Sequence, residues 1–110
     1  MCSQGSCVFC DIAKDLPNST SIMESEHAFA LPDHKPITKG HTLIITKKHF
    51  ENFMEVEDEH IKDVSILAKK TVKKLMELHP DIQGVNYVSN QGAKAKQVVF
   101  HFHLHIIPRY

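Results

Sequence analysis

Near its C-terminal end the chain carries the stretch FHFHLHII at residues 100–107. Histidines and apolar residues alternate in it, and a β-strand directs successive side chains to opposite faces. The stretch therefore predicts a strand that presents His101, His103 and His105 on one face. The opposite face is apolar and is expected to cover the hydrophobic core. Its members are Phe100, Phe102, Leu104 and Ile106.

A row of three histidines on one strand face has two chemical uses. An imidazole can act as a nucleophile or as a general acid or base near neutral pH, and a neutral imidazole can bind a metal ion. A plain solvated face is the alternative, but the unbroken apolar row opposite the histidines argues against it. The central residue, His103, is placed between two others and is a candidate for attack on an electrophile such as phosphorus.

Outward from this strand, the sequence predicts further strands and two helices. Strands are expected at residues 20–24, 26–31, 41–46 and 84–90. A short helix is expected at residues 7–15 and a longer one from about 57 to 79, and a polar loop covers 91–97. Strands, a helix and more strands, without regular βαβ alternation, predict one α+β domain over residues 1–110 with a mostly antiparallel sheet.

The longer helix is defined by an apolar stripe, because its apolar residues recur three or four positions apart. The stripe consists of Ile61, Val64, Ala68, Val72, Leu75 and Met76. Acidic residues at 57–59 and basic residues near the other end match the helix dipole, and Pro80 stops the helix.

Charge and composition exclude several classes of function. The chain has 13 basic and 13 acidic side chains, with a pI of about 7.1, so bulk electrostatic binding of nucleic acid is not expected. No apolar run approaches the roughly 20 residues of a membrane span, and no signal-peptide pattern begins the chain. We therefore expect a cytoplasmic protein that binds neither nucleic acid nor a membrane.

All three cysteines lie within the first ten positions, and Cys7 and Cys10 form a C-x-x-C pair. Because the number of cysteines is odd and they are clustered at one end, the sequence predicts reduced thiols rather than a disulfide framework. A thioredoxin-like redox pair would follow a strand, and none is expected here. A structural zinc site is a second interpretation, because two thiolates can form half of a tetrahedral ligand set. Unliganded buried thiols are the third.

The histidine pattern, with an apolar residue after each histidine and a further one at position 107, resembles the signature of the histidine-triad (HIT) family of nucleotide hydrolases and transferases. The segments at 90–98 and 39–49 are also similar to that family, so the resemblance covers essentially the whole chain. It implies a HIT-like fold and the hydrolysis of purine nucleoside 5′-monophosphate derivatives, first of all phosphoramidates such as adenosine 5′-phosphoramidate. Dinucleoside polyphosphates are the rival substrates, and a non-catalytic nucleotide-binding scaffold is the rival function.

The resemblance also implies roles for individual residues. His103 matches the nucleophile that attacks the α-phosphorus and forms a nucleotidyl-histidine intermediate. His105 matches the residue that hydrogen-bonds the transferring phosphate. Asn90 and the backbone amides around Gln97 and Val98 match the phosphate-binding segment. Val98 stands where the phosphoramidase branch carries a hydroxyl residue, so side-chain assistance to the leaving group is missing there.

For the nucleoside half of the substrate, Asp33 matches the carboxylate that accepts hydrogen bonds from both ribose hydroxyls. A loop cap beside a proline is the alternative role for this aspartate. His41 is expected near the site, although a packed residue at the start of a strand is an equal alternative. Phe9, Ile12 and Phe29 are candidates for an apolar base pocket, with plain core packing as the alternative for each.

For the cysteine pair, the resemblance implies a structural zinc ion (Zn2+) held by Cys7, Cys10, His49 and His101, as in bacterial members of the family. Such an ion would tie the N-terminal segment to the strand that carries His103. The resemblance further implies a homodimer, in which two subunits join their sheets and pack their long helices together.

Overall fold

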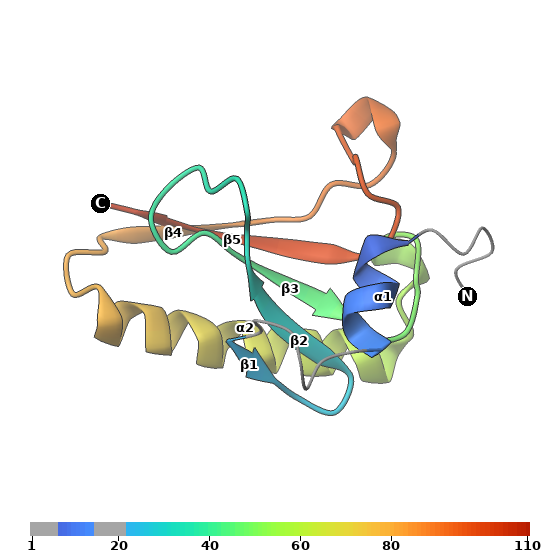
Figure 1. The fold of residues 1–110 in the computed structure, drawn as a ribbon, viewed down its shortest axis with the longest axis horizontal. Helices are drawn as coiled ribbons and strands as arrows, with labels where there is room; N and C mark the ends of the chain where they lie inside the picture. Colours follow the sequence, from blue (N-terminus) through green and yellow to red (C-terminus); the bar gives the residue numbers. More distant parts are fainter. Residues whose placement is uncertain (1–6, 15–21) are drawn as a thin grey trace.

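The computed structural model describes residues 7–14 and 22–110, which form an α+β fold. One five-stranded antiparallel sheet has the strand order β1-β2-β3-β5-β4. The strands are β1 (Met23–Glu24), β2 (Ala28–Pro32), β3 (Thr42–Thr46), β4 (Gly84–Val88) and β5 (His103–Arg109). The helices are α1 (Val8–Lys14), α2 (Asp58–Leu78) and the 3-10 turns η2 (Phe53–Glu55) and η3 (Ala93–Ala95). Figure 1 shows α2 running along the sheet and α1 beside the ends of the central strands.

Helix α2 packs on the sheet through the predicted stripe, with one exception. Its buried residues are Val64, Leu67, Ala68, Thr71, Val72 and Leu75. Ile61 is partly buried against the same core, but Met76 is 48% exposed, so its assignment to the stripe is wrong. Met76 directly follows Leu75, and adjacent positions on a helix lie about 100° apart, which turns Met76 toward the outer surface.

The central strands β2 and β3 carry buried side chains on both faces, one beneath α2 and the other next to α1. Ala28, Ala30 and Ile44 belong to the core beneath α2. The alternate residues Phe29, Leu43 and Ile45 pack with Phe9 of α1 in a second core. This double burial explains why residues 43–45 form a continuous apolar run instead of an alternating pattern.

The histidine strand begins later than the sequence predicts. Strand β5 starts at His103, where it pairs with Ile45 of β3. The N–H of Phe102 donates to the carbonyl of Phe50 at 2.6 Å and takes no part in the sheet. Phe102 and Ile106 are buried as predicted, whereas Phe100 is 44% exposed and does not belong to the core face.

Other boundaries shift by a few residues. The strand predicted at 84–90 ends at Val88, and the loop predicted at 91–97 contains η3. The strand predicted at 20–24 is present as β1, and residues 20 and 21 lie outside the described part. Residue 15, the predicted end of the first helix, lies outside it as well. Within residues 7–14 and 22–110, no helix combines the length and apolar character needed to cross a membrane.

Candidate active site and metal-ligand cluster

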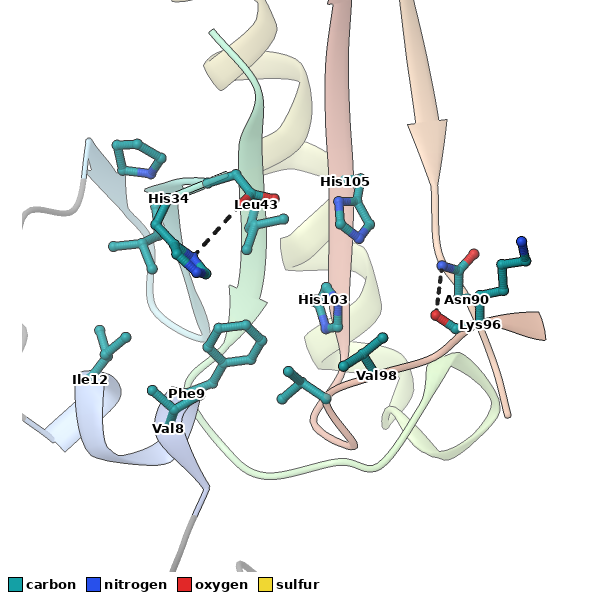
Figure 2. Close-up of a pocket in the computed structure, with 14 residues that line it drawn as sticks. Val8, Phe9, Ile12, His34, Leu43, Asn90, Lys96, Val98, His103 and His105 are labelled. Carbon is teal, nitrogen blue, oxygen red and sulfur yellow. Dashed lines mark hydrogen bonds and ion pairs between the residues drawn. The ribbon is translucent and has the colours of Figure 1, made fainter. Parts of the chain in front are cut away.

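A cavity of about 700 Å³ lies on the α1 side of the sheet. Figure 2 shows its two contrasting ends. One end is formed by apolar side chains of α1, including Phe9 and Ile12, and the other carries Asn90 and Lys96. The rings of β5 lie between these ends. The cavity therefore offers an apolar compartment, a histidine centre and a polar end, which suits a ligand with an apolar ring system and an anionic group.

His103 is held in one tautomer by the main chain. Its Nδ1 lies 2.8 Å from the carbonyl oxygen of His101, and a carbonyl can only accept a hydrogen bond. Nδ1 therefore carries the proton, and Nε2 is left with a free lone pair. The edge contact between the His103 and Phe9 rings, with centroids 5.2 Å apart, orients the imidazole further. A fixed imidazole with an available lone pair on a cavity has the chemistry of a nucleophile.

His105 is held in the opposite tautomer by a chain of hydrogen bonds. The N–H of Ile37 donates to Nδ1 of His41 at 3.1 Å, so His41 carries its proton on Nε2. That Nε2 lies 2.9 Å from Nδ1 of His105 and donates to it. His105 must then carry its own proton on Nε2. The two cavity histidines thus present complementary groups, a lone pair from His103 and an N–H donor from His105.

Burial keeps this donor chain neutral. Desolvation is the main cause that lowers the pKa of His105 to about 4, and the neighbouring His103 and His41 lower it further. Desolvation also lowers the pKa of His41, against the opposing effect of the Asp33 carboxylate. Both rings are therefore neutral near pH 7, and the hydrogen-bond directions given above apply there.

Asp33 follows β2 and lies at the edge of the cavity. One oxygen, Oδ1, accepts the N–H of Lys35 at 2.9 Å, so the carboxylate does cap its loop. The other oxygen, Oδ2, lies 3.4 Å from Nε2 of His41. The side chain is 15% exposed, which leaves acceptor capacity open to the cavity. The predicted ribose-binding position and the alternative loop cap are therefore compatible.

The polar end of the cavity is built by the segment that carries η3. Asn90 and Val98 line the cavity. Gln97 is buried: its Oε1 accepts the N–H of Gly92 at 2.8 Å, and its Nε2 donates to the carbonyl of Glu51 at 2.7 Å. The main-chain N–H of Gln97 also donates to the carbonyl oxygen of Gly92, at 3.1 Å. Gln97 therefore holds the segment in shape, and Asn90 is left as the amide side chain on the cavity.

The four remaining candidates lie differently with respect to the cavity. Phe9 and Ile12 line it, whereas Phe29 is fully buried in the core below. His41 is buried behind His105 and reaches the cavity only through that ring. The sequence analysis missed Lys96, for which the sequence carries no signal, and Leu43, whose pairing with His105 places both side chains on one face.

A second cluster lies at the start of α1 and brings together the four predicted metal ligands. The Nδ1 atom of His101 lies 3.2 Å from Sγ of Cys7 and 3.3 Å from Sγ of Cys10. Nδ1 of His49 lies 3.3 Å from the Cys10 sulfur and 3.2 Å from Nδ1 of His101. All four donor atoms lie within 4.8 Å of one another and could hold a metal ion.

The donor set and the tautomers fit zinc. Tetrahedral zinc with two sulfur and two nitrogen ligands requires neighbouring donors about 3.3–3.8 Å apart, close to the spacing observed. Nε2 of His101 donates to the carbonyl of Thr46 at 2.7 Å, which leaves Nδ1 with its lone pair toward the cysteines. Burial lowers the pKa of His101 to about 4 and lowers that of His49, so both rings have the neutral form that binds metal.

The state of the cysteines differs from the expectation of reduced thiols. Cys7 is a free cysteine, whereas Cys10 takes part in a disulfide. A thiolate, and not a disulfide sulfur, is the zinc ligand. Metal binding by both sulfurs therefore requires that this disulfide be reduced.

A profile of the HIT domain family matches residues 16–110. The chain belongs to the HIT family. It is 52% identical over 106 residues to an uncharacterized HIT-like protein of Mycoplasma genitalium, covering 96% of this chain and 74% of that one. It is 37% identical over 112 residues to the adenosine 5′-monophosphoramidase of Candida albicans, covering 99% of this chain and 74% of that enzyme.

Among solved structures, the chain is similar to a zinc-bound histidine-triad family protein from Mycobacterium smegmatis. The TM-score is 0.85 at 34% identity, and the match covers 96% of this chain and 76% of that protein. Together with the family profile, this similarity confirms the HIT-like α+β fold predicted from the histidine pattern.

Proposed function

We propose that this HIT protein hydrolyses purine nucleoside 5′-monophosphate derivatives, with adenosine 5′-phosphoramidate as the first choice. The observation that carries the proposal is the pair of opposed tautomers on one cavity: the free Nε2 lone pair of His103 and the Nε2–H of His105. Attack on phosphorus requires the first group, and the charge that grows on the phosphate oxygens requires the second. The similarity to a phosphoramidase of C. albicans supports the same substrate class.

The reaction has two displacements. The lone pair of His103 attacks the α-phosphorus, and an Nε2–P bond forms as the P–N bond of the phosphoramidate breaks. The NH2 group leaves with the bonding electron pair and takes up one proton to become ammonia. Water then attacks phosphorus, the Nε2–P bond breaks with its electron pair returning to His103, and one water proton is released. The products are AMP and ammonia.

The cavity orients the substrate for this reaction. The base lies in the apolar compartment against Phe9 and Ile12, and the ribose hydroxyls donate to the open acceptor positions of Asp33. This placement brings the α-phosphate to the two histidines. The Asn90 amide then faces the phosphate oxygens from the polar end.

The test is AMP release from adenosine 5′-phosphoramidate by the wild type and by His103→Ala. We expect turnover that disappears in the variant. Full turnover by His103→Ala would refute the proposed nucleophile. Tight AMP binding without turnover of any nucleotide derivative would instead establish a non-catalytic nucleotide-binding protein.

We further propose that the reduced protein binds structural zinc through Cys7, Cys10, His49 and His101. The support is the donor geometry and the similarity to a zinc-bound protein of the family. Zinc here supplies no chemistry to the reaction: it would hold the start of α1 against the segment that leads into β5. Elemental analysis of untagged protein purified under reducing conditions should find about one zinc per chain, and Cys7→Ser should lose it. Absence of zinc from the reduced wild type would refute this site.

A homodimer is the third proposal, and it rests on an exposed apolar surface. Strand β4 is an edge strand of the sheet. The exposed apolar residues of β4 and α2 are Ile66, Met76, Leu78, Tyr87 and Val88. Val72, Met76 and Tyr87 also line one shallow groove between α2 and β4. A second copy covering this surface would pair the free edge and bury these side chains.

Light scattering tests the homodimer, with an expected mass of twice the 12.5 kDa of the chain. Tyr87→Asp should shift the mass toward the monomer, because it places a charge in the proposed interface. Ile37→Asp is the control, since Ile37 is also exposed and lies outside this surface. A wild-type monomer at micromolar concentration would refute the proposal.

A further inference from the structure

Lys96 occupies an unusual backbone position at the polar end of the cavity. It caps η3 with φ 70° and ψ 30°, in the left-handed region. Among residues 7–14 and 22–110 it is the one residue other than glycine with positive φ. A residue with a Cβ atom pays about 1 kcal/mol for this conformation. Glycine would form the same turn without that cost, so the presence of lysine calls for a role of its side chain.

Lys96 lines the rim of the cavity, and its side chain extends outward past Asn90. Figure 2 shows it beside Asn90, across the two histidines from Phe9 and Ile12. The Asn90 amide donates to the main-chain carbonyl of Lys96 at 3.4 Å, which links the two residues. Among the described side chains that line this cavity, Lys96 is the one lysine or arginine.

The ammonium group of Lys96 has no carboxylate partner in the part of the chain that is described. The lysines with an ion pair there are Lys47 and Lys48, and both lie elsewhere. The carboxylate on the cavity, Asp33, belongs to the opposite end, next to His41. The ammonium end lies beyond Asn90, on the side away from the histidines (Figure 2), and rotation of the flexible side chain can bring this unpaired charge to an anionic ligand at this end of the cavity.

We propose that Lys96 determines leaving-group specificity by binding the negative charge of a leaving group that is itself a phosphate. This inference rests on the proposed function. With the nucleoside at the Asp33 end and the α-phosphorus at His103, the next group along the substrate lies toward Asn90 and Lys96. Val98, the neighbouring residue on the cavity, has no polar side chain to offer. Lys96 thereby raises the activity toward phosphoanhydrides, such as dinucleoside polyphosphates, above the activity that the same cavity would have without this cation.

The step that benefits is the first displacement. As the Nε2–P bond to His103 forms, the bond between the α-phosphorus and the bridging oxygen breaks, and the nucleoside diphosphate departs with the electron pair on that oxygen. Its negative charge increases by one in this step. The ammonium group of Lys96 attracts this charge more strongly than that of the bound substrate, which favours the transition state over the ground state.

The experiment compares AMP with ADP, because ADP is AMP extended by one phosphate at the leaving-group position. Calorimetry gives the dissociation constants of both nucleotides for the wild type, Lys96→Gln and Lys94→Gln. Gln keeps the length of the chain and a similar backbone cost but removes the charge. Lys94 is exposed on the same turn and does not line the cavity, so it is the matched control.

We expect Lys96→Gln to lower the preference for ADP over AMP by about three- to fivefold, as suits a partly solvated charge pair. The affinity of Lys96→Gln for AMP should change less than its affinity for ADP. The Lys94→Gln protein should bind both nucleotides as the wild type does. Raising the salt concentration from about 0.05 to about 0.5 M should reduce the ADP preference of the wild type but not of Lys96→Gln. An equal loss for AMP and ADP would overturn the proposal, because it would place Lys96 on the α-phosphate.

A second arm uses turnover of adenosine 5′-phosphoramidate and diadenosine triphosphate. Lys96→Gln should lower kcat/KM for the triphosphate by about five- to tenfold relative to kcat/KM for the phosphoramidate, whose leaving group is not a phosphate. Lys96→Gly should match Lys96→Gln. A loss in the glycine variant alone would assign the effect to the backbone and overturn the proposal. If the wild type hydrolyses neither substrate, the proposed function fails. The ratio of the AMP and ADP dissociation constants still decides the role of Lys96 in that case.

Discussion

Replacement of His41 tests the tautomer argument at a residue that does not line the cavity. His41→Phe removes the N–H that lies 2.9 Å from Nδ1 of His105 and fills the buried space with a ring of similar shape. An unpaired buried acceptor costs about 1–3 kcal/mol. His105 escapes this cost by moving its proton to Nδ1, and its Nε2 then faces the cavity as an acceptor. The substrate phosphate would lose its donor.

The size of the effect follows from the lost donor. Removal of one preorganised donor to a developing oxyanion lowers kcat by about 10²–10³. Some of the population keeps the productive tautomer, so we expect a decrease near the lower end, about a hundredfold, with KM changed by less than about threefold. His41→Gln can still place an amide N–H near Nδ1 of His105 and should recover part of kcat.

AMP release from adenosine 5′-phosphoramidate, followed over a range of substrate concentrations, measures the separate changes in kcat and KM. A thermal melt checks that each variant folds. If His41→Phe is folded and retains kcat within about twofold of the wild type, then His105 does not need its N–H donor from Nε2. The reasoning from hydrogen-bond directions would be refuted in that case.

Further predictions concern stability and nucleoside binding. Phe102→Ala should lower the unfolding free energy by about 3–5 kcal/mol in urea titrations, because this ring is buried beneath α2, and a change below about 1 kcal/mol would contradict its core role. In reduced, metal-free protein, the unfolding free energy should be at its full value above about pH 6.5 and should fall as the pH decreases toward 4. The reason is that the folded-state pKa values of His101 and His105 lie below the unfolded value. Urea titrations across this pH range should show the loss, and an unfolding free energy independent of pH would contradict it. The fully buried His101 accounts for up to about 3 kcal/mol, and the exposed His34 serves as the control through His34→Ala. Asp33→Asn should raise KM for the phosphoramidate about tenfold and leave binding of a 2′,3′-dideoxy analogue unchanged; equal losses for both would assign Asp33 to the loop alone.

The sequence predicted the fold because its strongest patterns have one structural solution. Val64, Ala68, Val72 and Leu75 can only share one face of a helix, and the structure buries them together. Period-two alternation holds within β5, but it does not reveal where a strand begins. Phe100 continues the alternation and is nevertheless exposed, because the main chain of Phe102 bonds to Phe50 and not to a neighbouring strand.

The candidate site was predictable where chemistry depends on residue type and less so where it depends on backbone shape. The four sulfur and imidazole donors of the metal-ligand cluster could be named from spacing and family resemblance, and the structure brings them together. Lys96 could not be found this way, because nothing in the sequence indicates that a lysine adopts a left-handed conformation at the cavity. The buried place of His41 behind His105 likewise depends on pairing between β3 and β5.

His101 contributes to the two sites with different parts of the same residue. Its ring belongs to the metal-ligand cluster, while its carbonyl oxygen fixes the proton of His103. Every amino acid carries that carbonyl, so a codon change at position 101 alters the ring and leaves the acceptor in place. The hydrogen bond that fixes the proton of His103 therefore does not depend on which side chain stands at position 101. Descendants of this gene could lose the cluster ligand and keep the hydrogen bond that fixes the tautomer of His103.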